Sequence, residues 1–298
     1  MTAIIAADGL GKRYRQRWAL RDCTFEVPPR RVVGLVGPNG AGKTTLLHIA
    51  VGLLEPSAGR ISVLGGRPAE SAEQRGRVGF VAQQNPLYSS LTVADHLRLG
   101  AWLNPAWDTE AAELRIAELG LDPKQRAGRL SGGQHAQLAL TLAIAKRPRL
   151  LVLDEPVASL DPLARHEFLQ RLMQAVAEDE MTVVLSSHLV ADLERVCDYL
   201  IVLTDARVQL AGDVDDLLAS HYRLTGPRRD PASLPSDQQV IEASHTDRQS
   251  TFFVRCDGPI LDPAWTVEPV GLEDLVLAYM RHAGVSDRVR EPHLGAVR

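Results

Sequence analysis

One run of eight residues restricts the fold of this 298-residue chain more than any other feature of its sequence. The run is Gly37, Pro38, Asn39, Gly40, Ala41, Gly42, Lys43 and Thr44. It follows an apolar segment, Val32–Val36, which is typical of a buried strand, and it opens a helical pattern over residues 44–53. In the pattern GxxxxGK[ST], glycines let backbone N–H groups approach an anion, while the lysine and the hydroxyl reach phosphate and Mg²⁺. The run therefore predicts a phosphate-binding loop, extended by Thr45, rather than a glycine-rich turn beside a surface lysine.

A second apolar segment ends in two carboxylates. Residues 150–153 read Leu-Leu-Val-Leu, and Asp154 and Glu155 follow. Ligands collect at the carboxyl ends of strands in open α/β sheets, so the first acid is placed to bind a metal ion and the second to face a ligand. Many buried strands end in an acid, so this segment alone is only moderate evidence for a functional site. The phosphate loop upstream strengthens that interpretation. Short β-rich segments alternate with helical patterns, which predicts an α/β fold with a largely parallel sheet.

Four shorter motifs complete the pattern. Gln83 follows the apolar residues 78–81, Asp161 ends a Ser-Leu-Asp triplet, and His188 follows residues 183–187, which read Val-Val-Leu-Ser-Ser. The fourth motif begins a helical pattern and, taken alone, is a helix cap: Ser131, Gly132, Gly133 and Gln134. Their order and separations resemble those of the ATPases of ABC transporters, and the resemblance covers residues 4–218.

The resemblance implies a fold and a chemistry. The fold is that of a P-loop NTPase of the ABC ATPase type, α/β with an inserted helical lobe and a small C-terminal α+β extension. The activity is ATP hydrolysis with Mg²⁺, in which Glu155 polarises the attacking water as general base and His188 holds the γ-phosphate. Gln83 contacts both the metal and the water. The metal ligands that the resemblance implies are Thr44, Gln83 and Asp154.

The same resemblance divides the nucleotide site between two chains. Tyr14 matches the aromatic residue that stacks on adenine, with Trp18 as a rival and a core tyrosine as the alternative. The residues 131–134 face the γ-phosphate that is bound by the phosphate loop of another subunit, and Asp161 belongs to the contact between the two sites. A second copy of the chain, or a related cassette, is therefore an expected partner.

Composition narrows the remaining function classes. The net charge is -4 and the isoelectric point is near 6.1, which disfavours a nucleic-acid partner. Three separated cysteines indicate neither a zinc site nor a disulfide framework. The first ten residues lack the pattern of a secretion signal, and the longest nearly apolar segment, residues 138–145, is far short of the roughly 20 residues that cross a bilayer. We therefore expect a cytoplasmic protein that is not inserted in the membrane and is held at its inner face by a separate transmembrane permease.

The domain organisation follows from changes in pattern. We expect an ATPase domain over residues 1–218 with a helical lobe over about 88–135, a linker over 219–236 and an accessory domain over 237–298. The accessory domain is expected to contain strands at 239–243 and 251–255 and a helix at 272–282. The apolar face of the lobe is expected to include Trp102, Trp107, Leu114 and Leu119.

Less specific marks suggest a branch of the family and a docking surface. The pair Trp107-Asp108 and the segments 121–124 and 271–275 resemble ATPases of bacterial antibiotic and multidrug exporters. The alternatives are a soluble ABC protein acting on ribosomes or DNA, which usually has two cassettes or long coiled coils, and an ATPase that drives a membrane complex without transport. The permease is expected to dock beside the lobe on Pro86, Leu87, Tyr88 and Leu91.

Overall fold

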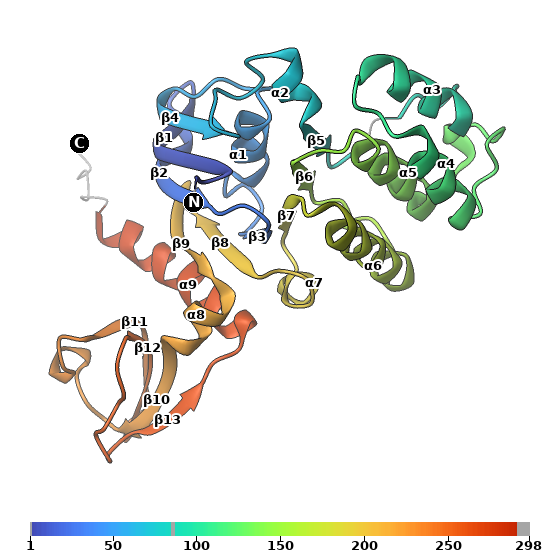
Figure 1. Ribbon diagram of the computed structural model, residues 1–298. Coiled ribbons are helices and arrows are strands. Elements are labelled where there is room, and N and C mark those ends of the chain that lie inside the picture. Colours follow the sequence, from blue (N-terminus) through green and yellow to red (C-terminus); the bar gives the residue numbers. More distant parts are fainter. Residues whose placement is uncertain (1, 85–86, 291–298) are drawn as a thin grey trace, which may run out of the picture.

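A six-stranded sheet forms the centre of the computed structural model, which describes residues 2–84 and 87–290, with side chains through residue 282 (Figure 1). Its first five strands are parallel and the sixth is antiparallel. The apolar strands β3 and β6 are buried along their whole length, as expected of a parallel sheet covered on both faces. In spatial order the strands are β5 (Val78–Val81), β6 (Leu150–Asp154), β7 (Thr182–Ser187), β3 (Val32–Val36), β8 (Tyr199–Thr204) and β9 (Arg207–Asp213).

A three-stranded antiparallel sheet covers one side of the central sheet. It has the order β2-β1-β4, and its apolar side chains pack with helix α1 (Lys43–Ala50) in one cluster. Short helix α2 (Ala72–Gly76) follows it, and helices α6 (Pro162–Asp179) and α7 (Val190–Glu194) pack around the central sheet. The strands of the smaller sheet are β1 (Ile5–Tyr14), β2 (Arg17–Val27) and β4 (Ala58–Val63).

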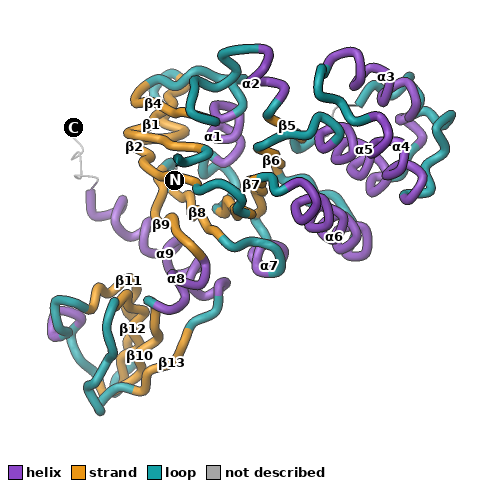
Figure 2. The backbone as a smooth tube through the Cα atoms, in the orientation of Figure 1, coloured by secondary structure: helices purple, strands orange, loops and turns teal. Residues whose placement is uncertain are grey.

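The expected helical lobe lies at one end of the molecule, beyond β5 and β6 (Figures 1 and 2). It contains α3 (Val93–Leu103), α4 (Thr109–Glu118), the 3₁₀ turn η1 (Ala127–Arg129) and α5 (Gly132–Ile144). Its core is formed by Val93, Ile116, Leu121, Ala127 and Leu138.

The predicted apolar face of the lobe is wrong at two residues. The side chains of Trp102 and Leu114 are 82% and 59% exposed. The buried face of α3 begins at Val93, and a helical period of 3.6 residues continues it through positions 96, 97 and 100, so position 102 faces away. Trp107 does pack inward, against Gly100, and Leu119 is partly buried against the lobe core.

The predicted linker is also wrong over its first part. Residues 219–236 contain strand β10 (His221–Pro227), which pairs with two other strands in an antiparallel sheet. The polar, proline-containing composition that suggested a linker begins at Gly226, at the end of this strand. The sheet has the order β11-β12-β10-β13, with β11 (Gln238–His245), β12 (Gln249–Cys256) and β13 (Thr266–Pro269), and it is joined to the centre by α8 (Val214–Ala219).

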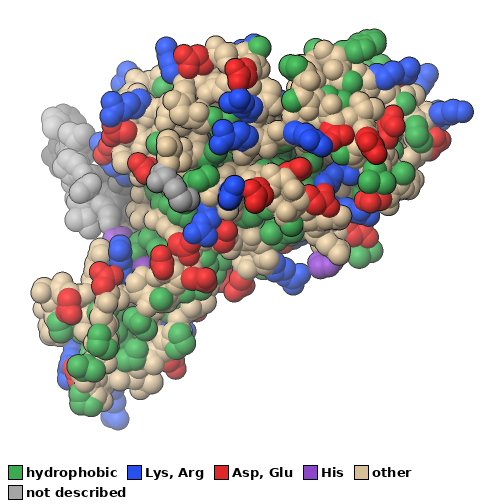
Figure 3. All heavy atoms as spheres, in the orientation of Figure 1, with side chains coloured by type: hydrophobic (Ala, Val, Ile, Leu, Met, Phe, Trp, Pro, Cys, Tyr) green, Lys and Arg blue, Asp and Glu red, His purple; other side chains and the backbone are tan. Residues whose placement is uncertain are grey.

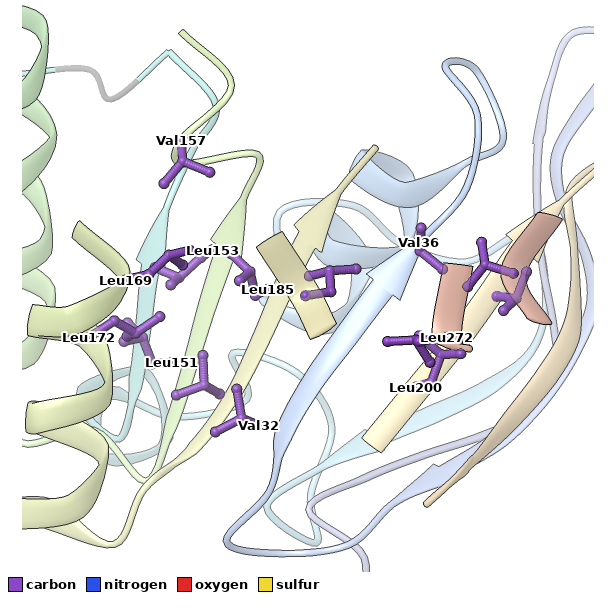
Figure 4. Close-up of a cluster of buried hydrophobic side chains, with 14 of the residues drawn as sticks. Val32, Val36, Leu151, Leu153, Val157, Leu169, Leu172, Leu185, Leu200 and Leu272 are labelled. Atoms are coloured by element: carbon purple, nitrogen blue, oxygen red, sulfur yellow. The ribbon is translucent and has the colours of Figure 1, made fainter. Parts of the chain in front are cut away.

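The last helix connects this extension to the ATPase core. Helix α9 spans Leu272–Arg290, beyond the predicted end at residue 282. Leu272 belongs to the same buried cluster as Val36 and Leu200 of the central sheet, and Figure 4 places these side chains together. On the other side, Tyr279 and buried His221 of β10 are joined by a hydrogen bond of 2.9 Å. The extension and the cassette therefore share one hydrophobic core.

Candidate functional site

The phosphate loop connects β3 to α1, as the sequence predicts. The N-cap of α1 is Gly42, which adopts a left-handed φ of 111° and provides no side chain to cap the helix. A Cβ atom at Gly42 would overlap the carbonyl oxygen of Ala19, and one at Gly37 would overlap that of Leu203. These close approaches require glycine, and they hold the loop against β2 and β8. The positive end of α1 is left open to an anion.

Lys43 is buried beneath this loop, with 5% of its surface exposed. Its Nζ donates hydrogen bonds to the carbonyl oxygens of Gly37 at 2.8 Å and Pro38 at 3.3 Å. It also lies 3.2 Å from Oε1 of Glu155. An ammonium group has three protons, so these three acceptors account for all of them. A phosphate that binds this lysine has to replace at least one of the three.

The two carboxylates at the end of β6 occupy different environments. Asp154 is 1% exposed, its Oδ1 accepts a hydrogen bond of 2.8 Å from Ser186 Oγ, and its Oδ2 is buried without a hydrogen-bond partner in the described part of the chain. Glu155 adopts a φ of 44°, and its N–H donates to the same Ser186 Oγ at 2.8 Å. The serine therefore fixes both acids, a role that the sequence analysis missed.

Two further predicted residues converge on Glu155. Its Oε2 accepts a hydrogen bond from Gln83 Nε2 at 3.4 Å and lies 3.2 Å from His188 Nδ1. Gln83 follows β5 and His188 follows β7, so the ends of neighbouring strands bring these residues together with Lys43. Such convergence occurs at the carboxyl edge of open α/β sheets, where ligands bind.

The two candidate base-stacking residues lie on the hairpin between β1 and β2. Tyr14 is 48% exposed, and Lys12 Nζ lies 5.6 Å from the centre of its ring. Trp18 is half-buried beneath the guanidinium of Arg13, also at 5.6 Å, and it precedes Ala19, which contacts the phosphate loop. Both aromatic side chains remain candidates for the contact with the base.

The motif at residues 131–134 lies at the start of α5, apart from the side chains that converge on Glu155. Ser131 and Gln134 form a reciprocal capping box at the start of α5, with hydrogen bonds of 3.2 and 3.0 Å. Asp161 likewise caps α6 through the N–H groups of Leu163 and Ala164. Within residues 2–84 and 87–290, none of the interactions that join Lys43, Gln83, Glu155 and His188 involves the motif.

The segment after Gln83 connects the site to the lobe. Tyr88 is 63% exposed, and its N–H donates to Nε2 of His96 at 3.1 Å. Leu87 is partly buried against both the lobe core and the central core, and Leu91 is half-buried, while Pro86 lies outside the described residues. The N–H of Gly128 donates to Ser89 O at 3.1 Å, which links this segment to the residues just before the motif.

A phosphate loop between a buried strand and a helix, with acids at the end of another parallel strand of the same sheet, defines a P-loop nucleoside triphosphatase. The family model described as ABC transporter matches residues 20–158. The chain is 36% identical over 247 residues to Nod factor export ATP-binding protein I of Burkholderia orbicola, covering 79% of this chain and 80% of that protein. It is 32% identical over 219 residues to the uncharacterized ABC transporter ATP-binding protein YxlF of Bacillus subtilis, covering 72% of each.

Solved structures agree with these relatives. One is a structure of the ATP binding subunit of an ABC transporter, which is 32% identical to this chain and has a TM-score of 0.65. The match covers 72% of this chain and 92% of that chain. A bacterial ABC transporter cassette solved as a dimer matches in fold, with 24% identity, a TM-score of 0.64 and coverage of 70% of this chain and 98% of that chain. The chain belongs to the family of ABC transporter ATP-binding proteins. It is an ATP-binding and ATP-hydrolysing subunit, as its sequence motifs predict.

Proposed function

We propose that this subunit hydrolyses ATP at a site centred on Glu155 and thereby drives export through a separate transmembrane permease. The observation that carries the proposal is the position of the Glu155 carboxylate, which contacts Lys43, Gln83 and His188 at once. When the γ-phosphate binds Lys43, it competes with Glu155 for the ammonium protons. Glu155 is then released to accept a proton from a water molecule, while His188 stabilises the phosphate.

The residues at this edge fit Mg²⁺, the metal ion that we propose accompanies ATP. Asp154 Oδ2 is a buried oxygen for which the described residues provide no hydrogen-bond partner, and Mg²⁺ prefers oxygen ligands from one or two protein groups together with substrate phosphates. Thr44 and Gln83 supply the other oxygens in this proposal. The described residues contain no group of three or more His, Cys, Asp or Glu side chains that could hold a metal ion by themselves. When bound, the metal neutralises charge that develops on the phosphates.

Two copies of the chain form the complete site in this proposal. The motif at residues 131–134 is exposed at Ser131 and Gly132, and it begins a helix whose N-terminal end attracts anions. Among the described residues, none of the interactions that join Lys43, Gln83, Glu155 and His188, here called the Lys43 cluster, involves the motif. We therefore assign the motif to the nucleotide of a second chain. Asp161 lies at the start of α6, which packs beside α5, and it belongs to the same surface. ATP then holds the two chains together until hydrolysis.

The permease is proposed to dock on the lobe near Tyr88. Tyr88 is the exposed aromatic residue of the segment that follows Gln83, so a partner bound there senses the nucleotide site.

Among the described residues, no helix has both the length and the hydropathy to cross a membrane. We therefore propose that the permease holds the subunit at the cytoplasmic face. Export, rather than import, is proposed from the likeness to relatives that are named export ATP-binding proteins. On the face drawn in Figure 3, lysine and arginine side chains are interspersed with acidic side chains. This mixture of charges argues against a nucleic-acid partner.

The docking proposal is tested by replacing Tyr88 with aspartate in the full-length protein. We expect loss of co-purification with the membrane subunit and unchanged ATP affinity, because a charge replaces an exposed apolar contact. The matched control is Leu261→Asp, which alters an 83% exposed leucine in the extension. Leu87 is a poor target because its partial burial joins two cores. Retention of the membrane subunit by the folded Tyr88 variant would refute the docking surface.

A further inference from the structure

Arg165 connects two loops of the site that are distant in sequence. It lies one turn inside α6, and its Nη2 donates to the carbonyl oxygen of Leu160, just before the N-cap Asp161, at 3.5 Å. Its Nη1 lies 3.5 Å from Oδ2 of Asp192. Asp192 is in the first turn of α7, four residues after His188 in the sequence. One guanidinium therefore touches both the loop before α6 and the helix that follows His188.

The two side chains lie in a protected environment. Asp192 is 9% exposed, and the side chain of Arg165 is 23% exposed. In the described residues, Arg165 Nε and Asp192 Oδ2 are buried without a hydrogen-bond partner, so each depends on the ion pair for compensation of its charge. Separating a buried pair is costly because it leaves an uncompensated charge. A displacement of the loop at 159–161 is therefore expected to displace α7.

The loop also lies next to the motif that begins α5. A Cβ atom added to Gly132 would lie 4.0 Å from Cδ2 of Leu160, and one added to Gly133 would lie 3.1 Å from Cβ of Ala164. Residues 131–133 therefore lie beside residues 160–164. The carbonyl oxygen of Leu160 is bound by Arg165, so the guanidinium is attached to the loop that borders the motif.

We propose that Arg165 is a positioning residue that couples the motif at 131–134 to His188 through Asp192. The inference rests on the proposed function, in which the motif binds the nucleotide of a second chain and His188 serves the nucleotide of its own chain. Binding at the shared surface moves the loop at 159–161, and the Arg165–Asp192 pair carries that movement to α7. His188 then reaches the γ-phosphate only when both nucleotides are in place.

The test is a double-mutant cycle between Arg165→Gln and His188→Ala, measured in the full-length protein with Mg-ATP. Arg165→Gln alone is expected to lower kcat about tenfold, with the KM for ATP within about twofold of wild type, in the range of measured couplings between sites. In the His188→Ala background, single-turnover rates are expected to fall by less than about twofold further, because Arg165 acts through that histidine. The matched control is Arg171→Gln on the same helix, which breaks an ion pair with Glu118 at 2.9 Å and is expected to leave kcat unchanged.

Three results would overturn the proposal. One is a folded Arg165→Gln protein with the wild-type kcat, and another is the same tenfold loss in both backgrounds. The third, a His188→Ala protein with the wild-type rate, would refute the proposed role of His188 itself, so it is distinguishable from a failure of the coupling alone. Asp192→Asn, which keeps the shape of the side chain, provides a second route if Arg165→Gln does not fold. It is expected to reproduce the tenfold loss and the non-additivity, and additive effects would contradict the proposal.

Discussion

The phosphate loop and the motif at residues 131–134 are both glycine-rich helix starts, yet their surroundings differ. Lys43 is buried, and its ammonium binds two backbone carbonyls and Glu155 of the same chain. Ser131 is exposed, and among the described residues its N–H and Oγ bond only to Gln134 of its own capping box. The first region is a cluster of side chains that one chain assembles alone. The second has the chemistry to bind an anion, but within the described residues it takes no part in the Lys43 cluster, which is why we propose that it serves the nucleotide of another chain.

The largest expected effect is that of Glu155→Gln, which removes the proposed general base of the first region. The amide keeps the shape of the side chain but does not accept a proton, so kcat is expected to fall about a thousandfold while ATP remains bound. Steady-state hydrolysis and nucleotide titration measure the two quantities. Glu180→Gln, at an exposed residue paired with Arg30, is the control and should hydrolyse ATP normally. Hydrolysis by Glu155→Gln near the wild-type rate would show that another group acts as the base.

Lys43→Ala tests the same region through binding. The substitution removes the ammonium that faces the phosphates and leaves Glu155 without its cation, so the Kd for ATP is expected to rise about 100-fold, equivalent to about 2.7 kcal/mol. Titration calorimetry provides the measurement, with exposed Lys124→Ala as the control. An unchanged Kd would contradict the assignment of this loop to the phosphates.

A pair of glycine substitutions compares the regions directly. At Gly37 a Cβ atom would overlap the carbonyl of Leu203, so Gly37→Ala is expected to lower the free energy of unfolding by at least about 2 kcal/mol. At Gly132 the nearest side-chain atom is 4.0 Å away, and Gly132→Ala in a helix is expected to change stability by no more than about 1 kcal/mol. Denaturant unfolding measures both. Equal losses of stability would mean that the motif is as tightly packed in one chain as the phosphate loop.

The sequence predicted those parts of the site that are contiguous. The phosphate loop, Asp154 and Glu155 each combine residue type with a strand or helix next to it, and the structure brings them together at one sheet edge. Ser186 was missed because its partner Asp154 becomes a neighbour only through the register of β6 and β7. The same limit explains Arg165, whose contact with Asp192 depends on the packing of two helices.

The fold was predicted where apolar segments are continuous. Strands β3 and β6 are continuous apolar segments, and their predicted positions agree with the structure. Strand β10 was missed because the composition around it is polar. The packing of Leu272 on the central sheet was missed because an amphipathic pattern identifies a buried face without identifying what covers it.

The central claim is that a nucleotide site requires the motif of a second chain, and ATP-driven dimerisation tests it most directly. Sedimentation velocity in Mg-ATP would compare Glu155→Gln with the double variant Glu155→Gln, Ser131→Arg. The single variant is expected to sediment as a dimer because it retains ATP. The double variant is expected to remain a monomer with nearly unchanged ATP affinity, because Ser131 is exposed and lies outside the Lys43 cluster. Dimerisation of the double variant as tight as that of the single variant would contradict the account.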